Sequence, residues 1–204
     1  MPEKQNTLTI GLFGTCGSSA WRESFIKYYS ENSIQFFDPI VEDWDPSCAA
    51  IESWHLAHDE ILIFPITKET YGQGSLSESG FSIIQAMKFC DRRDIIIMIE
   101  QELDPKLMPS DVEKALLNDL ESKGISNLIN LDILHYRMMK EKADRAKDSL
   151  RSRALVKEHL SLLRLDTVFV VDTLQEALNV SLKCYAARNI LKNIRNIFNP
   201  QNKI

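Results

Sequence analysis

The sequence predicts an α/β fold with a five-stranded parallel sheet in the flavodoxin-like strand order 2-1-3-4-5. Short apolar segments alternate with helical segments, which is typical of strand–helix–strand units. The segment at 94–100 is almost continuously apolar, as expected for a parallel strand buried on both faces. We expect one domain over residues 1–204, with a helical insertion at 101–164 before the last strand.

The chain opens with a strand, a glycine-containing turn and a helix. The strand is expected at 8–13, the turn (GTCGSS) at 14–19 and the helix from about Trp21 to Ser30. This order matches the loops that hold phosphate groups at helix N-termini. The glycine spacing is GxxG rather than GxGxxG, so a tight turn that simply requires glycine is an equal alternative. Arg22 would either contact a phosphate or form a surface ion pair.

The second unit is shorter. Ile34–Phe37 is expected as a strand that Asp38 and Pro39 end. Asp45 and Pro46 then form a helix start, with the aspartate as N-cap and the proline in the first helical position. That helix is expected to reach about His58.

The stretch from Asp59 to Met87 carries the clearest chemical signal. A strand expected at 61–64 leads through a glycine- and serine-rich loop into a helix with Glu78 in its first turn. A carboxylate there would lie near the positive end of the helix dipole. The alternative is structural, because Ser75 and Glu78 also fit a capping box in which both side chains bond backbone N–H groups.

The remaining elements complete the sheet. Asp94–Glu100 and Thr167–Val171 are expected as the fourth and fifth strands. Thr173 and Glu176 form a capping box that opens the last helix.

The loops after the first three strands would meet at one edge of this sheet. Ligands of open parallel sheets bind beyond the carboxyl ends of the strands. The three loops concerned are 14–19, 38–45 and 65–77.

The insertion is helical in composition. Ser110 and Glu113 form another capping box, and Gly124 is a helix stop. The segment from Leu131 to Leu163 is highly charged and would be about 50 Å long as one helix, so we expect a break or an exposed helical arm. It would cover the site, pair with another subunit, or be a solvated insertion without a chemical role.

Composition excludes several function classes. A net charge of −5 gives no footprint for nucleic acid. No apolar run approaches the roughly 18–20 residues that cross a bilayer, and the N-terminus shows no signal-peptide core, so a cytoplasmic protein without membrane contact is expected. The four cysteines form no CxxC pair and the four histidines no ligand spacing, so neither a metal nor another cofactor is expected.

Several short motifs occur together in the first 100 residues. They are Gly14–Arg22 (GTCGSSAWR), Phe37-Asp38-Pro39 with Asp43-Trp44, the segment Glu52–Phe64 with Asp59, and Gly74–Glu78 (GSLSE) followed by Ser79-Gly80. In order and spacing this set resembles the nucleoside 2-deoxyribosyltransferase-like family, whose members have Rossmann-like folds and form homo-oligomers. The insertion lies outside the resemblance.

The resemblance implies cleavage or transfer at the N-glycosidic bond of a nucleoside, deoxynucleoside or nucleotide. Glu78 would be the nucleophile that attacks the anomeric carbon, and Asp59 would contact the base and assist the leaving nitrogen. A nucleoside or nucleotide is the expected small-molecule partner. The positions expected to bind it are Gly14, Thr15, Cys16, Gly17, Ser18, Trp21, Asp43, Trp44, Tyr71, Gly74, Ser75 and Ser77.

Two positions depart from the family. Gly72 stands where the family has an aspartate that grips the sugar hydroxyl, and about Leu12 stands where it has a tyrosine beside the nucleophile. Hydrolysis is therefore expected before transfer to a second base. Three alternatives remain: a glycohydrolase of NAD or a signalling nucleotide, a non-catalytic nucleotide sensor or adaptor, and an interaction protein that binds through the helix at 131–164.

Overall fold

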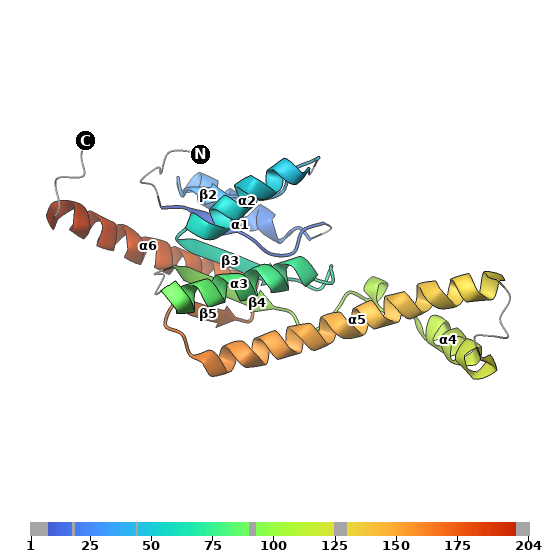
Figure 1. The fold of residues 1–204 in the computed structure, drawn as a ribbon. Coiled ribbons are helices and arrows are strands. Elements are labelled where there is room, and N and C mark those ends of the chain that lie inside the picture. Colours follow the sequence, from blue (N-terminus) through green and yellow to red (C-terminus); the bar gives the residue numbers. More distant parts are fainter. Residues whose placement is uncertain (1–7, 18, 44, 90–92, 125–129, 199–204) are drawn as a thin grey trace.

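The computed structural model describes residues 8–17, 19–43, 45–89, 93–124 and 130–198. It confirms the predicted α/β fold, with a five-stranded parallel sheet in the order β2-β1-β3-β4-β5 and helices on both faces (Figure 1). The strands are β1 (Ile10–Leu12), β2 (Phe36–Phe37), β3 (Ile61–Ile66), β4 (Asp94–Ile99) and β5 (Val168–Val171). The helices are α1 (Trp21–Glu31), α2 (Pro46–His58), α3 (Gln73–Phe89), α4 (Asp111–Lys123), α5 (Asn130–Leu163) and α6 (Leu174–Phe198), with a 3-10 turn η1 (Pro105–Leu107).

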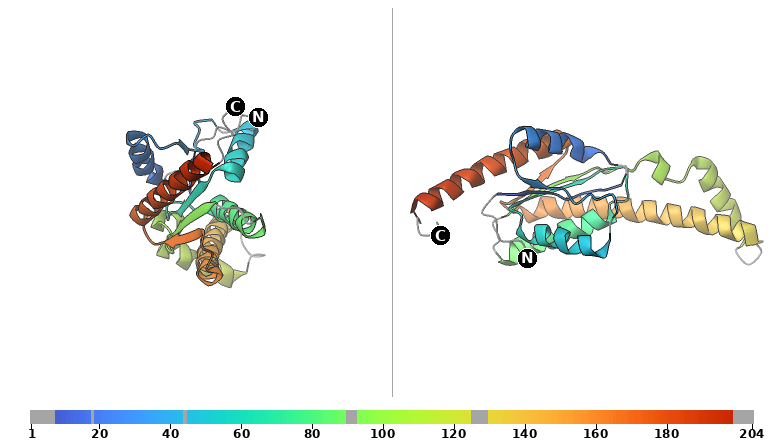
Figure 2. Two further views of the ribbon diagram at one scale, coloured as in Figure 1. Left: turned by 90° about the vertical axis from the view of Figure 1, so that its left-hand side faces the viewer. Right: turned by 90° about the horizontal axis from the view of Figure 1, so that it is seen from above.

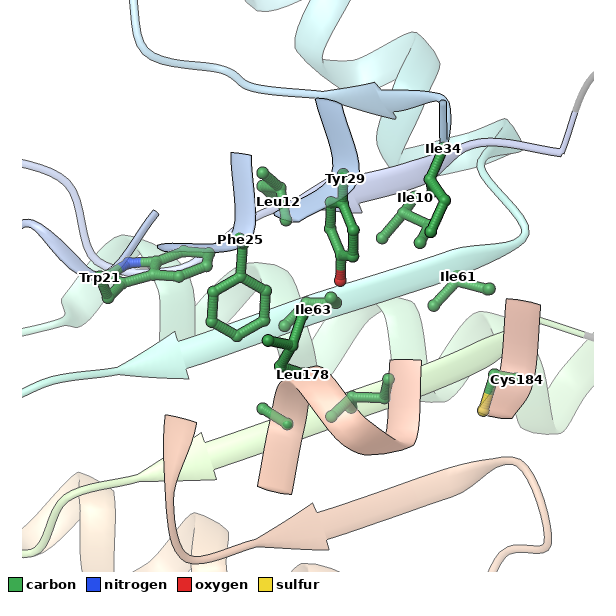
Figure 3. Close-up of a cluster of buried hydrophobic side chains, with 12 residues drawn as sticks. Ile10, Leu12, Trp21, Phe25, Tyr29, Ile34, Ile61, Ile63, Leu178 and Cys184 are labelled. Atoms are coloured by element: carbon green, nitrogen blue, oxygen red, sulfur yellow. The ribbon is translucent and has the colours of Figure 1, made fainter. Parts of the chain in front are cut away.

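One face of the sheet is covered by α1 and α6. Alternate strand residues, such as Ile61 and Ile63, point into this layer and are fully buried (Figure 3). The phenol of Tyr29 reaches across it and lies 2.5 Å from the Ser181 hydroxyl, which itself donates to the carbonyl of Leu178. This bond satisfies the only polar atom that Tyr29 brings into the core.

The opposite face is covered by α2, α3 and α5. The intervening strand residues point there, including Leu62, Phe64 and Ile66 of β3. Leu76 of α3 and Leu160 of α5 close this second core. Burial on both faces explains why the central strands β3 and β4 are apolar at every position after Asp94 of β4.

The predicted starts of α2, α4 and α6 are confirmed. The Asp45 side chain accepts from the backbone N–H of Ser47, ahead of Pro46. Reciprocal capping boxes begin α4 at Ser110 and α6 at Thr173. No helix in the described ranges is long and apolar enough to cross a membrane.

Strand β3 continues two residues beyond its expected end at Phe64, through Pro65. The carbonyl of Pro65 accepts from the N–H of Thr15, so the residue faces the side of β1. By that point β1 has ended at Leu12, and the backbone of Gly14 passes over the proline ring. The missing N–H of Pro65 therefore leaves no carbonyl of β1 without its donor.

The insertion consists of a projecting pair of helices and a helical segment that packs against the sheet domain. Helix α5 is a single helix of 34 residues, so the expected break is wrong, but its first half projects from the body with α4, as an exposed arm (Figures 1 and 2). Buried Leu120 and Met139 and the Glu113–Lys142 ion pair at 3.1 Å hold the two helices together. The second half of α5 packs on α3 and β5.

Two glycine substitutions should have opposite effects on stability. Gly14 has φ 142°, and a methyl group there would lie 2.7 Å from the Pro65 carbonyl oxygen, so Gly14→Ala should lower the free energy of unfolding by about 1–3 kcal/mol. Gly80 lies inside α3 with open space around it, so Gly80→Ala should raise it by about 0.5–1 kcal/mol. Urea unfolding measures both, and changes of the same sign would contradict this packing.

Candidate functional site

The loops after β1 and β3 meet α2 and α3 at the carboxyl edge of the sheet and enclose a cavity of about 240 Å³. This is the edge at which ligands bind in open parallel sheets. Six predicted site residues line it: Gly14, Thr15, Cys16, Gly74, Ser75 and Glu78. Five further residues complete the lining: Pro39, Glu52, Thr70, Gly72 and Gln73.

Glu78 lies in the second turn of α3, not in the first as expected. The helix begins at Gln73, because Gly72 adopts φ 67° and its carbonyl accepts the first helical hydrogen bond from Leu76 N–H at 3.0 Å. Ser75 is therefore inside the helix and the capping-box interpretation is wrong. The carboxyl group of Glu78 faces the cavity, one turn after Gly74, where a side chain would contact it.

A second carboxylate, Glu52 of α2, lines the same cavity. Burial, and next the charge of Glu52, raise the pKa of Glu78 above its ordinary value of 4.5, against a smaller effect of Arg22. Burial also raises the pKa of the Cys16 thiol. Sequence analysis did not single out Glu52; the only signal was an acidic residue on the helix that follows the second strand.

Arg22 is buried behind the glycine turn, so the expected surface ion pair is wrong. Its side chain is 2 % exposed and donates to the carbonyls of Leu12, Gly14 and Thr15 at 2.7–3.1 Å. It also lies 3.4 Å from the Asp38 carboxylate. These bonds fix the backbone that forms one wall of the cavity.

Hydroxyl groups join the two loops across the edge. Thr67 Oγ1 lies 2.7 Å from both Thr15 Oγ1 and Ser19 Oγ, and all three residues are buried. The N–H of Thr67 also donates to Thr15 Oγ1. These hydrogen bonds connect the loops after β1 and β3, so the two loops that line the cavity are held in a fixed position relative to each other.

Arg153 of α5 supports the other wall. It is fully buried and donates to the carbonyls of Ile66, Thr67, Thr70 and Glu100 at 2.7–3.0 Å. Burial lowers the pKa of its guanidinium. The insertion is thus more than a solvated helix, because its Arg153 guanidinium donates the hydrogen bonds that the backbone carbonyls of the loop after β3 need.

Asp59 does not line the cavity. It lies at the amino end of β3, is 2 % exposed, and its carboxyl oxygens are 2.9 and 3.1 Å from His55 Nδ1. Burial and the neighbouring Glu60 raise the pKa of Asp59 to about 8, and burial lowers the pKa of His55. Both shifts favour the neutral forms, and in a neutral pair the carboxyl group would donate to Nδ1.

Other predicted residues also lie elsewhere. Trp21 packs in the core and donates from Nε1 to the Thr15 carbonyl, and Asp43 and Gly17 are exposed and do not line the cavity. Tyr71 donates to the Leu107 carbonyl and stacks on the Arg145 guanidinium. Ser77 lines a neighbouring cavity. Ser18 and Trp44 lie outside the described residues.

Neither protein-family models nor curated protein sequences give a match to this chain. Across the described ranges, no three histidine, cysteine or carboxylate side chains come together as a metal-ligand set. The geometry of the cavity therefore carries the functional argument.

The carboxyl group of Glu78 should titrate above pH 4.5, and Glu52→Gln should lower its pKa because the substitution removes a like charge. Carbon-13 NMR titration of labelled protein measures both values. Glu31→Gln, at an exposed position of α1, is the matched control and should leave the Glu78 pKa unchanged. A Glu78 pKa at or below 4.5, or one that rises in Glu52→Gln, would contradict this arrangement.

Asp59 should make stability depend on pH. Its pKa in the folded protein, about 8, exceeds its ordinary 3.8, so the stabilisation is complete below the lower value and is lost as pH rises through the higher one. Between about pH 6 and pH 9, the free energy of unfolding should fall on the order of 2 kcal/mol further in wild type than in Asp59→Asn. Exposed Asp43→Asn should follow wild type in urea unfolding. If the free energy of unfolding depended on pH in the same way in wild type and Asp59→Asn, the Asp59 carboxyl group would already be ionised in this pH range and the prediction would be wrong.

Proposed function

We propose that this protein cleaves the N-glycosidic bond of a nucleoside or a related N-glycoside, with Glu78 as the nucleophile. The observation that carries the proposal is the pair of carboxylates, Glu78 and Glu52, in one cavity at the carboxyl edge of the sheet. Breaking the bond builds positive charge on the sugar, and a nearby carboxylate stabilises or captures that charge. The resemblance of the first 100 residues to nucleoside 2-deoxyribosyltransferases supports the same assignment.

In the proposed reaction, the Glu78 carboxylate attacks the anomeric carbon and forms an ester. The electron pair of the broken C–N bond goes to the base nitrogen, which takes a proton from a water molecule and leaves hydroxide. The hydroxide then attacks the same carbon, and Glu78 leaves as the carboxylate. The charge of Glu52 stabilises the positive charge on the sugar, and the net reaction is hydrolysis.

The surroundings of Glu78 fit this role. Gly74, one turn earlier, has no side chain to cover the carboxyl group. Within the described part of the chain, no lysine or arginine lines the cavity, so no cationic side chain would contact the sugar there. Glu52 adds a second carboxylate to the cavity, whereas Asp59 lies outside it and is hydrogen-bonded to His55.

A non-catalytic nucleotide-binding module is the second candidate, and Gly72 favours it. A side chain there would lie 2.8 Å from Ile66 Cγ2 on a backbone with φ 67°, so no sugar-gripping aspartate fits at this position. Leu12, near which the family has its tyrosine, is fully buried. The sugar-gripping aspartate of the family, and its tyrosine beside the nucleophile, are therefore both missing at these positions.

Chromatography of nucleosides, deoxynucleosides, their monophosphates and NAD, each incubated with the protein, tests the proposal. We expect free base from at least one compound with wild type, and a rate at least about a hundredfold lower with Glu78→Gln. Glu31→Gln, exposed on α1, is the control and should act like wild type. Nicotinamide as the only product would identify an NAD-type glycohydrolase.

Equal turnover by wild type and Glu78→Gln would rule out the nucleophile. No free base from any compound, together with a higher melting temperature in the presence of a nucleotide, would favour the binding module.

A further inference from the structure

A second cavity, of about 290 Å³, lies between α3 and α5, next to the first. Gln73 lines both, so the two cavities are adjacent. The insertion helix supplies most of the new wall. The lining residues are Gln73, Leu76 and Ser77 of α3 and Asp148, Ser149, Ser152 and Val156 of α5.

Two polar groups of this wall are hydrogen-bond acceptors for a ligand. Ser77 Oγ already donates its proton to the Gln73 carbonyl at 3.0 Å, so it can only accept from a ligand. The buried Ser149 hydroxyl is already engaged, because it donates to the Tyr71 carbonyl at 2.8 Å and accepts from Arg153 Nε at 3.2 Å. The carboxylate of Asp148 accepts as well, and its side chain has no hydrogen-bond or ion-pair partner within the described ranges.

Charge points the same way. No lysine or arginine lines either cavity in the part of the chain that the structure describes, whereas Glu52, Glu78 and Asp148 do. The two buried arginines beside the cavities direct most of their donors at backbone carbonyls, and the rest at side chains such as Cys16, Asp38 and Ser149. Phosphate would thus meet carboxylates without a counter-charge, while a neutral group rich in N–H donors would find matching acceptors.

We propose that the α3–α5 cavity is the base subsite and that it selects a nucleobase with an exocyclic amino group. This inference rests on the proposed function, in which the sugar lies at Glu78 in the first cavity. The base then extends past Gln73, whose side-chain amide can bond its ring nitrogens, and the amino group donates to Asp148. The insertion thereby sets the specificity of the chemistry at Glu78.

The test is calorimetric binding of two matched pairs, adenosine against inosine and cytidine against uridine, to the Glu78→Gln protein. We expect the amino-bearing nucleoside of each pair to bind at least about fivefold tighter. Asp148→Asn, added to this protein, should bring the ratio close to one, because the amide also presents donors. Asp144→Asn, one turn earlier on α5 and paired with Lys140 at 3.3 Å, is the control and should keep the ratio.

Equal binding within both pairs, an unchanged ratio in Asp148→Asn, or no binding of any of the four compounds would overturn the subsite. Because Glu78→Gln removes the proposed nucleophile, binding is measured without turnover. Selective binding that depends on Asp148, with no base released by wild type, would support the subsite and reject the hydrolase. Base release by wild type, with equal binding of the two nucleosides of each pair, would support the hydrolase and reject the subsite.

Discussion

Two buried guanidinium groups hold the carboxyl edge of the sheet, and the site depends on them. Strand pairing ends at this edge, so without other donors the last backbone carbonyls of the strands would be buried without a hydrogen bond. Arg22 from α1 satisfies the end of β1, and Arg153 from α5 satisfies the ends of β3 and β4. A buried charge is tolerated when its hydrogen bonds are complete, and each of these arginines contacts three or more carbonyls.

The same bonds decide what the cavities offer to a ligand. Arg22 and Arg153 direct most of their donors at backbone carbonyls and do not line the cavity, and the charged residues that line it in the described part of the chain are carboxylates. Burial and a like charge then raise the pKa of Glu78. The arrangement that stabilises the loops thus also produces an acidic site, which suits a cation-like transition state better than phosphate recognition.

The fold could be predicted because its strands and helix starts depend on local sequence patterns that long-range contacts did not change. The apolar strands, and the caps at Asp45, Ser110 and Thr173, are visible in sequence because each depends on neighbouring residues. The strand order follows because short right-handed crossovers leave few arrangements of five parallel strands. Pro65 extended β3 against expectation, since its missing donor faces a strand that has already ended.

The site was less predictable, because its residues are selected by contacts between distant segments. SLSE reads equally well as a capping box or as helix interior, and the positive φ of Gly72 decides between them. Arg153 looks like any other arginine of a charged helix until the packing of α5 buries it. Glu52 enters the cavity only because the parallel topology places α2 beside α3.

The insertion joins these features through helical geometry. Ser149 and Arg153 are four residues apart and face the loop after β3, whereas Asp148 and Ser152, also four apart, face the second cavity. A slide of α5 by one turn, about 5.4 Å, would bring Lys157 or Ser149 to the carbonyls that Arg153 now binds. Neither can replace it, because a hydroxyl has one donor and an ammonium lacks the planar fork that reaches carbonyls of two strands at once. Arg153 therefore fixes the register of the arm and, with it, the position of Asp148 beside the site.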